Sequence, residues 1–176
     1  MNKRVAFWLI PSQDDKAFFQ KIIDTLAQEH DALTFTPHVT IYVGEYAPDE
    51  SPAELLATAT QGIQPFSLRV DQLLYTEEFT KTLFVQFHPN PVLSQITESL
   101  RSNSSKPSDY VLNPHLSLIY QYLTEETKIE LATSMSLPKS EVFFDQVSAI
   151  SIPDTITKRE DVENWNLIFT QKLQEP

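Results

Sequence analysis

Apolar residues occur along the first part of the chain in runs that match the periods of strands and helices. Residues 5–10 form an unbroken apolar run that stops at a proline, which predicts a buried strand. The run is too short to cross a bilayer, because a membrane-spanning helix needs about 20 apolar residues. Helical spacing of apolar positions follows from Ser12 to His30, and β-branched residues predict a strand over 38–43.

The next segment adds a helix and a hairpin. Ser51 and Pro52 are residue types that favour a helix N-terminus, and Gly62 is typical of the position just past a helix end. Two strands are predicted over 66–75 and 80–88, and the polar residues between them predict a tight turn.

The second half of the chain repeats this order of helix, strand, helix and two strands. An apolar stripe predicts a helix over 91–102, and a strand over 115–120 follows a polar, serine-rich loop. A helix that begins at Thr124 and two strands, over 142–152 and 165–173, complete the half. The repeat therefore predicts a duplication.

The duplication indicates two lobes within one domain. We expect a single domain over residues 1–176, with lobes over about 12–88 and 90–176, and the strand over 4–10 is free to join the second lobe's sheet. A solenoid is excluded, because solenoids need three or more shorter repeats.

The centre of each half carries the same short motif. The two copies read Thr-Pro-His-Val-Thr-Ile-Tyr and Asn-Pro-His-Leu-Ser-Leu-Ile-Tyr. Because side chains alternate along a strand, His38 and Thr40 share one face, and so do His115 and Ser117. The same alternation places Tyr42 on the face of His38. Related by a pseudo-twofold axis, the two faces would meet across a cleft.

Two facing histidines suit the cleavage of a phosphodiester by water. One imidazole can take the proton of the water while the other protonates the leaving oxygen, since both titrate near neutral pH. Thr40 and Ser117 can donate hydrogen bonds to the phosphate oxygens. The residues alone leave open which histidine is the base. They also leave open whether Trp8 stacks on a ring of the substrate or packs in the core.

The composition narrows the classes of ligand. The chain carries 13 Lys and Arg against 24 Asp and Glu, a net charge of −11. This balance argues against broad binding to nucleic acid, which depends on many cations, but it allows one small phosphate ester in a local pocket. The absence of cysteine and the presence of only two glycines exclude thiolate metal sites and glycine-rich phosphate loops. We expect neither a metal site nor a cofactor.

The paired motifs resemble those of the two-histidine (2H) phosphoesterase superfamily. Within it, several stretches are similar to the plant and yeast type of cyclic phosphodiesterase: Trp8-Leu-Ile-Pro11, Pro37-His-Val-Thr40, Pro114-His-Leu-Ser-Leu-Ile-Tyr-Gln-Tyr-Leu-Thr-Glu-Glu126 and the late Trp165. The resemblance covers most of the chain, in the same order.

The resemblance implies an α+β fold of two lobes, with two antiparallel sheets flanking a cleft and helices outside. It implies metal-free hydrolysis of ADP-ribose 1″,2″-cyclic phosphate and of nucleoside 2′,3′-cyclic phosphates, which open to 2′-phosphates. His38 and His115 would be acid and base, with His115 favoured as the base. Thr40 and Ser117 would hold the phosphate. Tyr120 would lie near it, although strict alternation puts Tyr120 on the face away from His115.

Two alternatives stay open. One is an RNA-end 2′,3′-cyclic phosphoesterase, which would call for a basic track along the surface. The other is a non-catalytic nucleotide-binding module of the same fold, for which loss of one histidine is the expected mark. We also expect a cytoplasmic monomer whose partner is a small cyclic phosphate, without membrane association or extended nucleic-acid binding.

Overall fold

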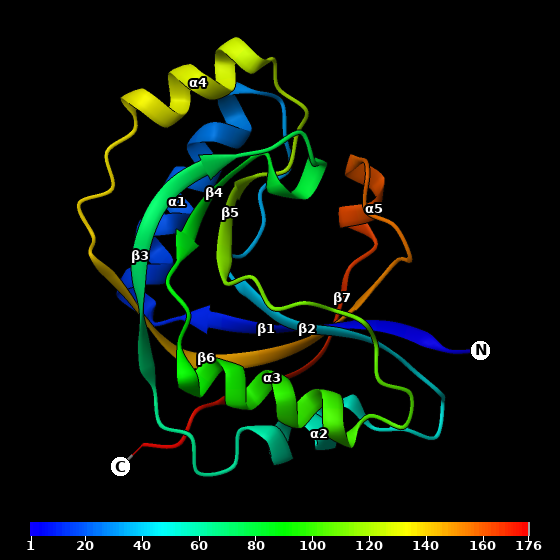
Figure 1. The fold of residues 1–176 in the computed structure, drawn as a ribbon. Coiled ribbons are helices and arrows are strands. Elements are labelled where there is room, and N and C mark those ends of the chain that lie inside the picture. Colours follow the sequence, from blue (N-terminus) through cyan, green and yellow to red (C-terminus); the bar gives the residue numbers. More distant parts are fainter. Residues whose placement is uncertain (176) are drawn as a thin grey trace.

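The computed structural model describes residues 1–175 as antiparallel strands with helices packed around them (Figure 1). The strands are β1 (Lys3–Pro11), β2 (Val39–Tyr46), β3 (Phe66–Tyr75), β4 (Leu83–Phe87), β5 (His115–Ile119), β6 (Glu141–Ile152) and β7 (Asn166–Lys172). The helices are α1 (Gln13–Glu29), α2 (Pro52–Ala59), α3 (Pro91–Asn103), α4 (Glu125–Ser134) and α5 (Arg159–Glu163), with a 3₁₀ turn, η1 (Phe79–Lys81). Sequence patterns predicted all of these except α5 and η1. Pro176, the last residue of the expected domain, lies outside the described residues.

The strands form two groups that are joined into one seven-stranded sheet. Its order is β1-β2-β5-β4-β3-β6-β7, and β1 also pairs with β6, so the pairings close a ring. One group contains β3, β4 and β5, and the other contains β2, β1, β6 and β7. The groups join where β2 meets β5 and where β3 pairs with β6 from Phe66 to Arg69. The expected α+β fold with antiparallel sheets is confirmed, and the structure adds that the two sheets are connected.

Each group contains strands from both halves of the sequence. β5, from the second half, pairs with β4 from the first, and β2, from the first half, lies in the group that contains β6 and β7. β1 lies between β2 and β6 and pairs with β6 from Arg4 to Pro11. The predicted lobe boundary near residue 89 therefore does not separate the two groups. β5 thus joins two strands of the first half, and β2 lies in a group that holds two strands from each half.

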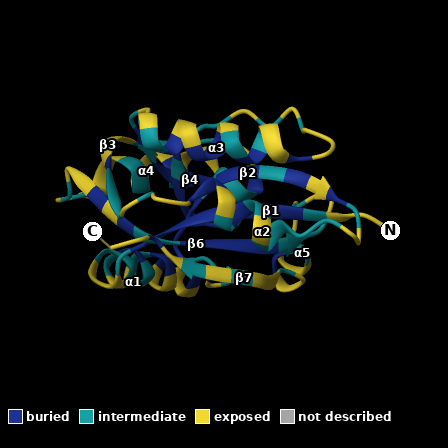
Figure 2. Ribbon diagram, turned by 90° about the horizontal axis from the view of Figure 1, so that it is seen from below, coloured by how far each residue is buried: buried dark blue, intermediate teal, exposed yellow. Residues whose placement is uncertain are grey.

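Helices α1 to α4 cover the outer faces of the two groups. α1 contacts β5 and β1, and α4 contacts β3, whereas α2 and α3 contact each other and the strands β2 and β6. Figure 2 shows buried residues along the strands and on the helix faces that meet them. Within residues 1–175, no helix is both long enough and apolar enough to cross a membrane.

Candidate active site

The two histidine motifs meet where the two groups of strands join. His115 is the first residue of β5, and His38 directly precedes β2. Val39 pairs with Leu116, and these are the residues that follow each histidine. Backbone pairing therefore brings together two motifs that are 115 − 38 = 77 residues apart in the sequence.

Both imidazoles are held in the same way. The Nδ1 of His38 lies 2.7 Å from the carbonyl oxygen of Thr36, and the Nδ1 of His115 lies 2.7 Å from the carbonyl oxygen of Asn113. A carbonyl only accepts hydrogen bonds, so each Nδ1 carries a proton and each neutral ring has its lone pair on Nε2. The two Nε2 atoms are therefore the ones that can exchange protons with a ligand.

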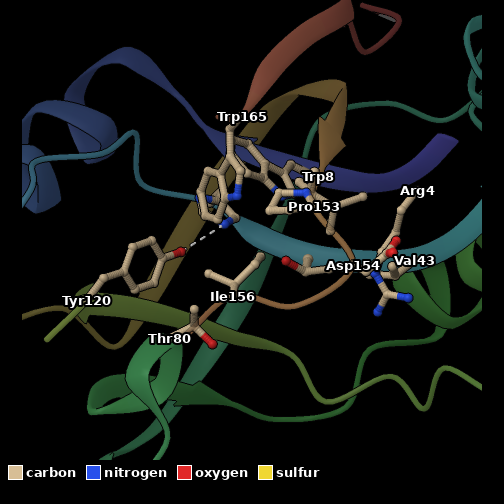
Figure 3. A pocket seen from close by; sticks show the side chains of 13 residues that line it. Arg4, Trp8, Val43, Thr80, Tyr120, Pro153, Asp154, Ile156 and Trp165 are labelled. Atoms are coloured by element: carbon tan, nitrogen blue, oxygen red, sulfur yellow. Dashed lines mark hydrogen bonds between the residues drawn. The ribbon is translucent and has the colours of Figure 1, made fainter. Parts of the chain in front are cut away.

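Aromatic side chains enclose His38. Its ring stacks on that of Trp8, with centroids 3.6 Å apart and planes 13° from parallel. Trp165 and Phe35 meet the imidazole edge to face, at 6.2 Å and 6.3 Å between centroids. The hydroxyl of Tyr120 lies 3.4 Å from the Nε2 of His38, which Figure 3 marks with a dashed line.

An open cavity of about 250 Å³ lies against His38 (Figure 3). Trp8, Thr40 and Tyr120 also line it. Trp8 is only 7% exposed, so most of its side chain packs in the protein interior, and the remaining part lines the cavity. Tyr120 is the first residue after β5, where strict alternation no longer holds, and it lies against His38.

The two predicted hydroxyls differ in their surroundings. Thr40 lines the cavity, whereas Ser117 is buried and neither Ser117 nor His115 belongs to the wall of this cavity. The Ser117 hydroxyl donates a hydrogen bond of 2.6 Å to the carbonyl oxygen of Thr80, and Thr80 does line the cavity. This hydrogen bond ties Ser117 of β5 to η1, the turn that contributes Thr80 to the cavity wall.

Tyr42 does not line the cavity, so its predicted place in the site is wrong. Phe7 of β1 lies opposite Tyr42, but the next residue, Trp8, lies opposite Thr40. Ile41 is therefore an extra residue, a β-bulge, and it reverses the alternation along β2. The Tyr42 ring is fully buried and stacks on Phe7, with centroids 6.5 Å apart.

A sequence model described as the 2′-5′ RNA ligase superfamily matches residues 11–152. The chain belongs to this superfamily. The match includes both histidine motifs and confirms the resemblance to 2H phosphoesterases.

Individual proteins are similar over almost the whole chain. The cyclic phosphodiesterase of Arabidopsis thaliana is 25% identical over 171 residues, which are 94% of this chain and 93% of that protein. The crystal structure of E. coli LigT complexed with 3′-AMP has a TM-score of 0.60 at 14% identity and covers 99% of this chain and 100% of its own. A crystal structure described as a phosphoesterase has a TM-score of 0.63 at 15% identity, covering 98% and 99% of the two chains. These structures show that the fold is shared.

In this member of the superfamily, burial lowers the pKa of both histidines. The pKa of His38 falls from 6.5 to about 4, mainly because the ring is buried, and the charge of nearby His115 lowers it further. Burial also lowers the pKa of His115, and its backbone hydrogen bond to Asn113 opposes this effect. The positive charge of Lys81 lowers the same pKa further, whereas the carboxylate of Glu78 raises it. Both rings are therefore neutral at neutral pH, and an anionic phosphate beside them would raise both pKa values.

Several residues of the site were not found by sequence reasoning. Arg4 and Asp154 line the cavity, and Lys81 of η1 acts on His115. Arg4 had a detectable signal, since it shares the face of β1 that carries Trp8 by simple alternation. Asp154 lies in the irregular segment after β6, which had no such signal.

Residues 1–175 contain no group of three or more His, Cys, Asp or Glu side chains arranged to hold a metal ion. Two histidine motifs meet at the junction of β2 and β5, with the phenol of Tyr120 beside His38 and the charges of Lys81 and Glu78 near His115. The arrangement is therefore suited to chemistry that moves protons between a ligand and two imidazoles.

Proposed function

We propose that this protein is a cyclic phosphodiesterase that opens ribose cyclic phosphates with water. Its substrates are nucleoside 2′,3′-cyclic phosphates, which yield 2′-phosphates, and ADP-ribose 1″,2″-cyclic phosphate. The observation that carries the proposal is the antiparallel pairing of Val39 with Leu116, which brings the two Pro-His motifs to one junction, where each histidine has an available Nε2 atom. The similarity to the Arabidopsis cyclic phosphodiesterase supports the same reaction.

In the proposed reaction the two histidines have opposite protonation states. The base takes a proton from water, and the water oxygen bonds to phosphorus. The bond from phosphorus to one ribose oxygen breaks, and the acid gives that oxygen its proton. The family resemblance favours His115 as the base, which makes His38 the acid. Because both rings are neutral in the free protein, the acid takes up its proton as the anionic substrate binds.

The two hydroxyls stabilise the phosphate in this proposal. Thr40 donates to a phosphate oxygen from the cavity wall, where it is in reach of a ligand. Ser117 does so after its proton turns away from the carbonyl oxygen of Thr80. Donors that meet growing charge on the phosphate oxygens contribute most in the transition state.

Hydrolysis of adenosine 2′,3′-cyclic phosphate, with the 2′- and 3′-monophosphate products separated, tests the proposal. We expect the wild type to form adenosine 2′-phosphate, and His38→Ala and His115→Ala each to lower kcat by on the order of 10²–10⁴. His88→Ala is the matched control, because that ring is 40% exposed and lies beside Asp71 at 3.8 Å, outside the site. Absence of turnover by the wild type, or wild-type kcat in either site variant, would overturn the proposal.

An oligonucleotide that ends in a 2′,3′-cyclic phosphate serves as the second substrate. We expect the mononucleotide to be the better substrate, because the acidic chain provides few cations for an extended backbone. A higher kcat/KM for the oligonucleotide would favour the RNA-end alternative instead. Binding of both ligands without turnover would favour the non-catalytic module.

A further inference from the structure

Arg4 lies at the far end of the cavity that contains His38. Arg4, Ala6 and Trp8 alternate onto one face of β1, and all three line this cavity. Trp8 stacks on His38, and Arg4 lies four residues away along the strand, about 13 Å at the rise of a β-strand. Figure 3 shows Arg4 on the opposite side of the cavity from Tyr120 and Trp165.

A second cavity continues from the first at Arg4. Its volume is about 450 Å³, and Arg4 and Val43 line both cavities. Lys106 adds a second cation to its wall, where Glu45 and Asp109 are the acidic residues. The two cavities share Arg4 and Val43, so Arg4 lies between His38 in the first cavity and Lys106 in the second.

The guanidinium of Arg4 forms no ion pair within the described residues, and Asp154 is the carboxylate that shares the first cavity with it. It takes part in none of the ion pairs that residues 1–175 form, so no carboxylate among them lies within 4.0 Å of it. The chain has a net charge of −11, yet this half-buried cation without an ion pair lies beside the candidate site. Its positive charge is therefore available to an anionic ligand. A guanidinium is also the group best matched to phosphate, because it donates two parallel hydrogen bonds.

We infer that Arg4 binds a second phosphate of the substrate, one attached to the ribose at a position other than the cyclic phosphate. This inference rests on the proposed function. It selects, as the preferred substrates, ribose cyclic phosphates that also carry a 5′-linked phosphate or diphosphate. ADP-ribose 1″,2″-cyclic phosphate belongs to this class, whereas an unsubstituted nucleoside 2′,3′-cyclic phosphate does not.

Two probes that differ by one phosphate test the inference. They are adenosine 2′,3′-cyclic phosphate and the same nucleotide with a 5′-phosphate. We expect the wild type to show a KM about tenfold lower for the 5′-phosphorylated probe, since a guanidinium–phosphate pair is a charge-assisted contact. Arg4→Gln should bring the ratio of the two KM values to about one, and Arg4→Lys should keep part of it.

Lys3→Gln is the matched control. Lys3 is the exposed neighbour of Arg4 and lines neither cavity, so this variant removes the same charge without touching the cavity walls. It should keep the wild-type ratio. A ratio near one in the wild type, a wild-type ratio in Arg4→Gln, or an equal loss in Lys3→Gln would overturn the inference.

Failure of the proposed function is recognised separately. If the wild type hydrolyses neither probe, the proposed reaction is wrong, and calorimetric titration of the same two probes decides the role of Arg4. Tighter binding of the 5′-phosphorylated probe that is lost in Arg4→Gln supports the subsite. Equal binding of both probes by the wild type overturns it.

Discussion

The hydroxyl of Tyr120 donates a hydrogen bond to the Nε2 of His38 across 3.4 Å. The direction follows from the ring, since its Nδ1–H already donates to the carbonyl oxygen of Thr36 and Nε2 holds the lone pair. Burial raises the pKa of Tyr120, which keeps the phenol protonated. Tyr120 follows the strand that begins with His115, so this contact ties the end of one motif to the histidine of the other.

Tyr120→Phe should raise the pKa of His38. A hydrogen bond donated to Nε2 stabilises the neutral ring, and its loss removes that preference. At about 1 kcal/mol for one hydrogen bond, the expected rise is about half a unit to one unit. NMR titration of the imidazole protons measures it, with Tyr122→Phe as the control because that ring is largely exposed. An unchanged or lower pKa would contradict the hydrogen bond.

Thr40→Val and Ser117→Ala should differ in their effect on stability. Both should lower kcat more than they raise KM, by up to on the order of 3 kcal/mol for one donor to the transition state. Ser117→Ala also removes the 2.6 Å hydrogen bond to Thr80, so it should lower the free energy of unfolding by about 1 kcal/mol.

Kinetics and urea unfolding of the two variants measure this difference. Thr40→Val should leave the free energy of unfolding close to that of the wild type, because its hydroxyl lies on the cavity wall. If Thr40→Val changes only KM, the hydroxyl binds the ground state and the transition state equally, and its assigned role is wrong.

Lys81→Gln should raise the pKa of His115. The positive charge of Lys81 lowers this pKa in the wild type, and its Nζ lies 4.9 Å from the centre of the Phe84 ring, which packs against His115. The limb of the kcat/KM profile that belongs to His115 should therefore move to higher pH. Lys21→Gln, an exposed change on α1, is the control. A His115 pKa that stays the same or falls would exclude the proposed coupling.

Local features of the fold were predictable because they depend on residues close in sequence. Ser51 begins α2 as predicted, and its hydroxyl accepts a hydrogen bond from the backbone N–H of Glu54. Thr124 does the same for α4 with the N–H of Thr127. The repeated Pro-His motif likewise pointed to a pair of histidines, and the structure sets their strands side by side.

Other features depend on long-range packing and could not be predicted from local patterns. The bulge at Ile41 is visible only in the pairing of β2 with β1, and it turns Tyr42 into the core. Lys81, whose charge acts on His115, lies in a 3₁₀ turn at the start of a predicted strand. Asp154 lies on the irregular segment after β6.

The buried, neutral state of His38 should make stability depend on pH. Its pKa is about 4 in the folded protein and about 6.5 in the unfolded chain, so between these values the unfolded chain binds the additional proton. The free energy of unfolding should therefore fall as the pH falls from about 6.5 to about 4, and this contribution should be constant above that window.

The size of the effect follows from the same two values. A difference of about 6.5 − 4 = 2.5 units corresponds to about 3 kcal/mol at most. His115 contributes in the same direction, because its pKa is also lowered by burial.

His38→Gln isolates the contribution of this one ring. The glutamine has no proton to gain in this range, and its side-chain oxygen can accept the hydrogen bond of Tyr120 in place of Nε2. Urea unfolding at several pH values from about 4.5 to 7.5 should give a shallower dependence for His38→Gln than for the wild type. His88→Gln is the matched control for the substitution itself, because that histidine lies beside Asp71, outside the site. Parallel curves for the wild type and His38→Gln would mean that His38 titrates alike in the folded and unfolded chain, and the neutral, aromatic-enclosed imidazole would then be the wrong starting state for the reaction.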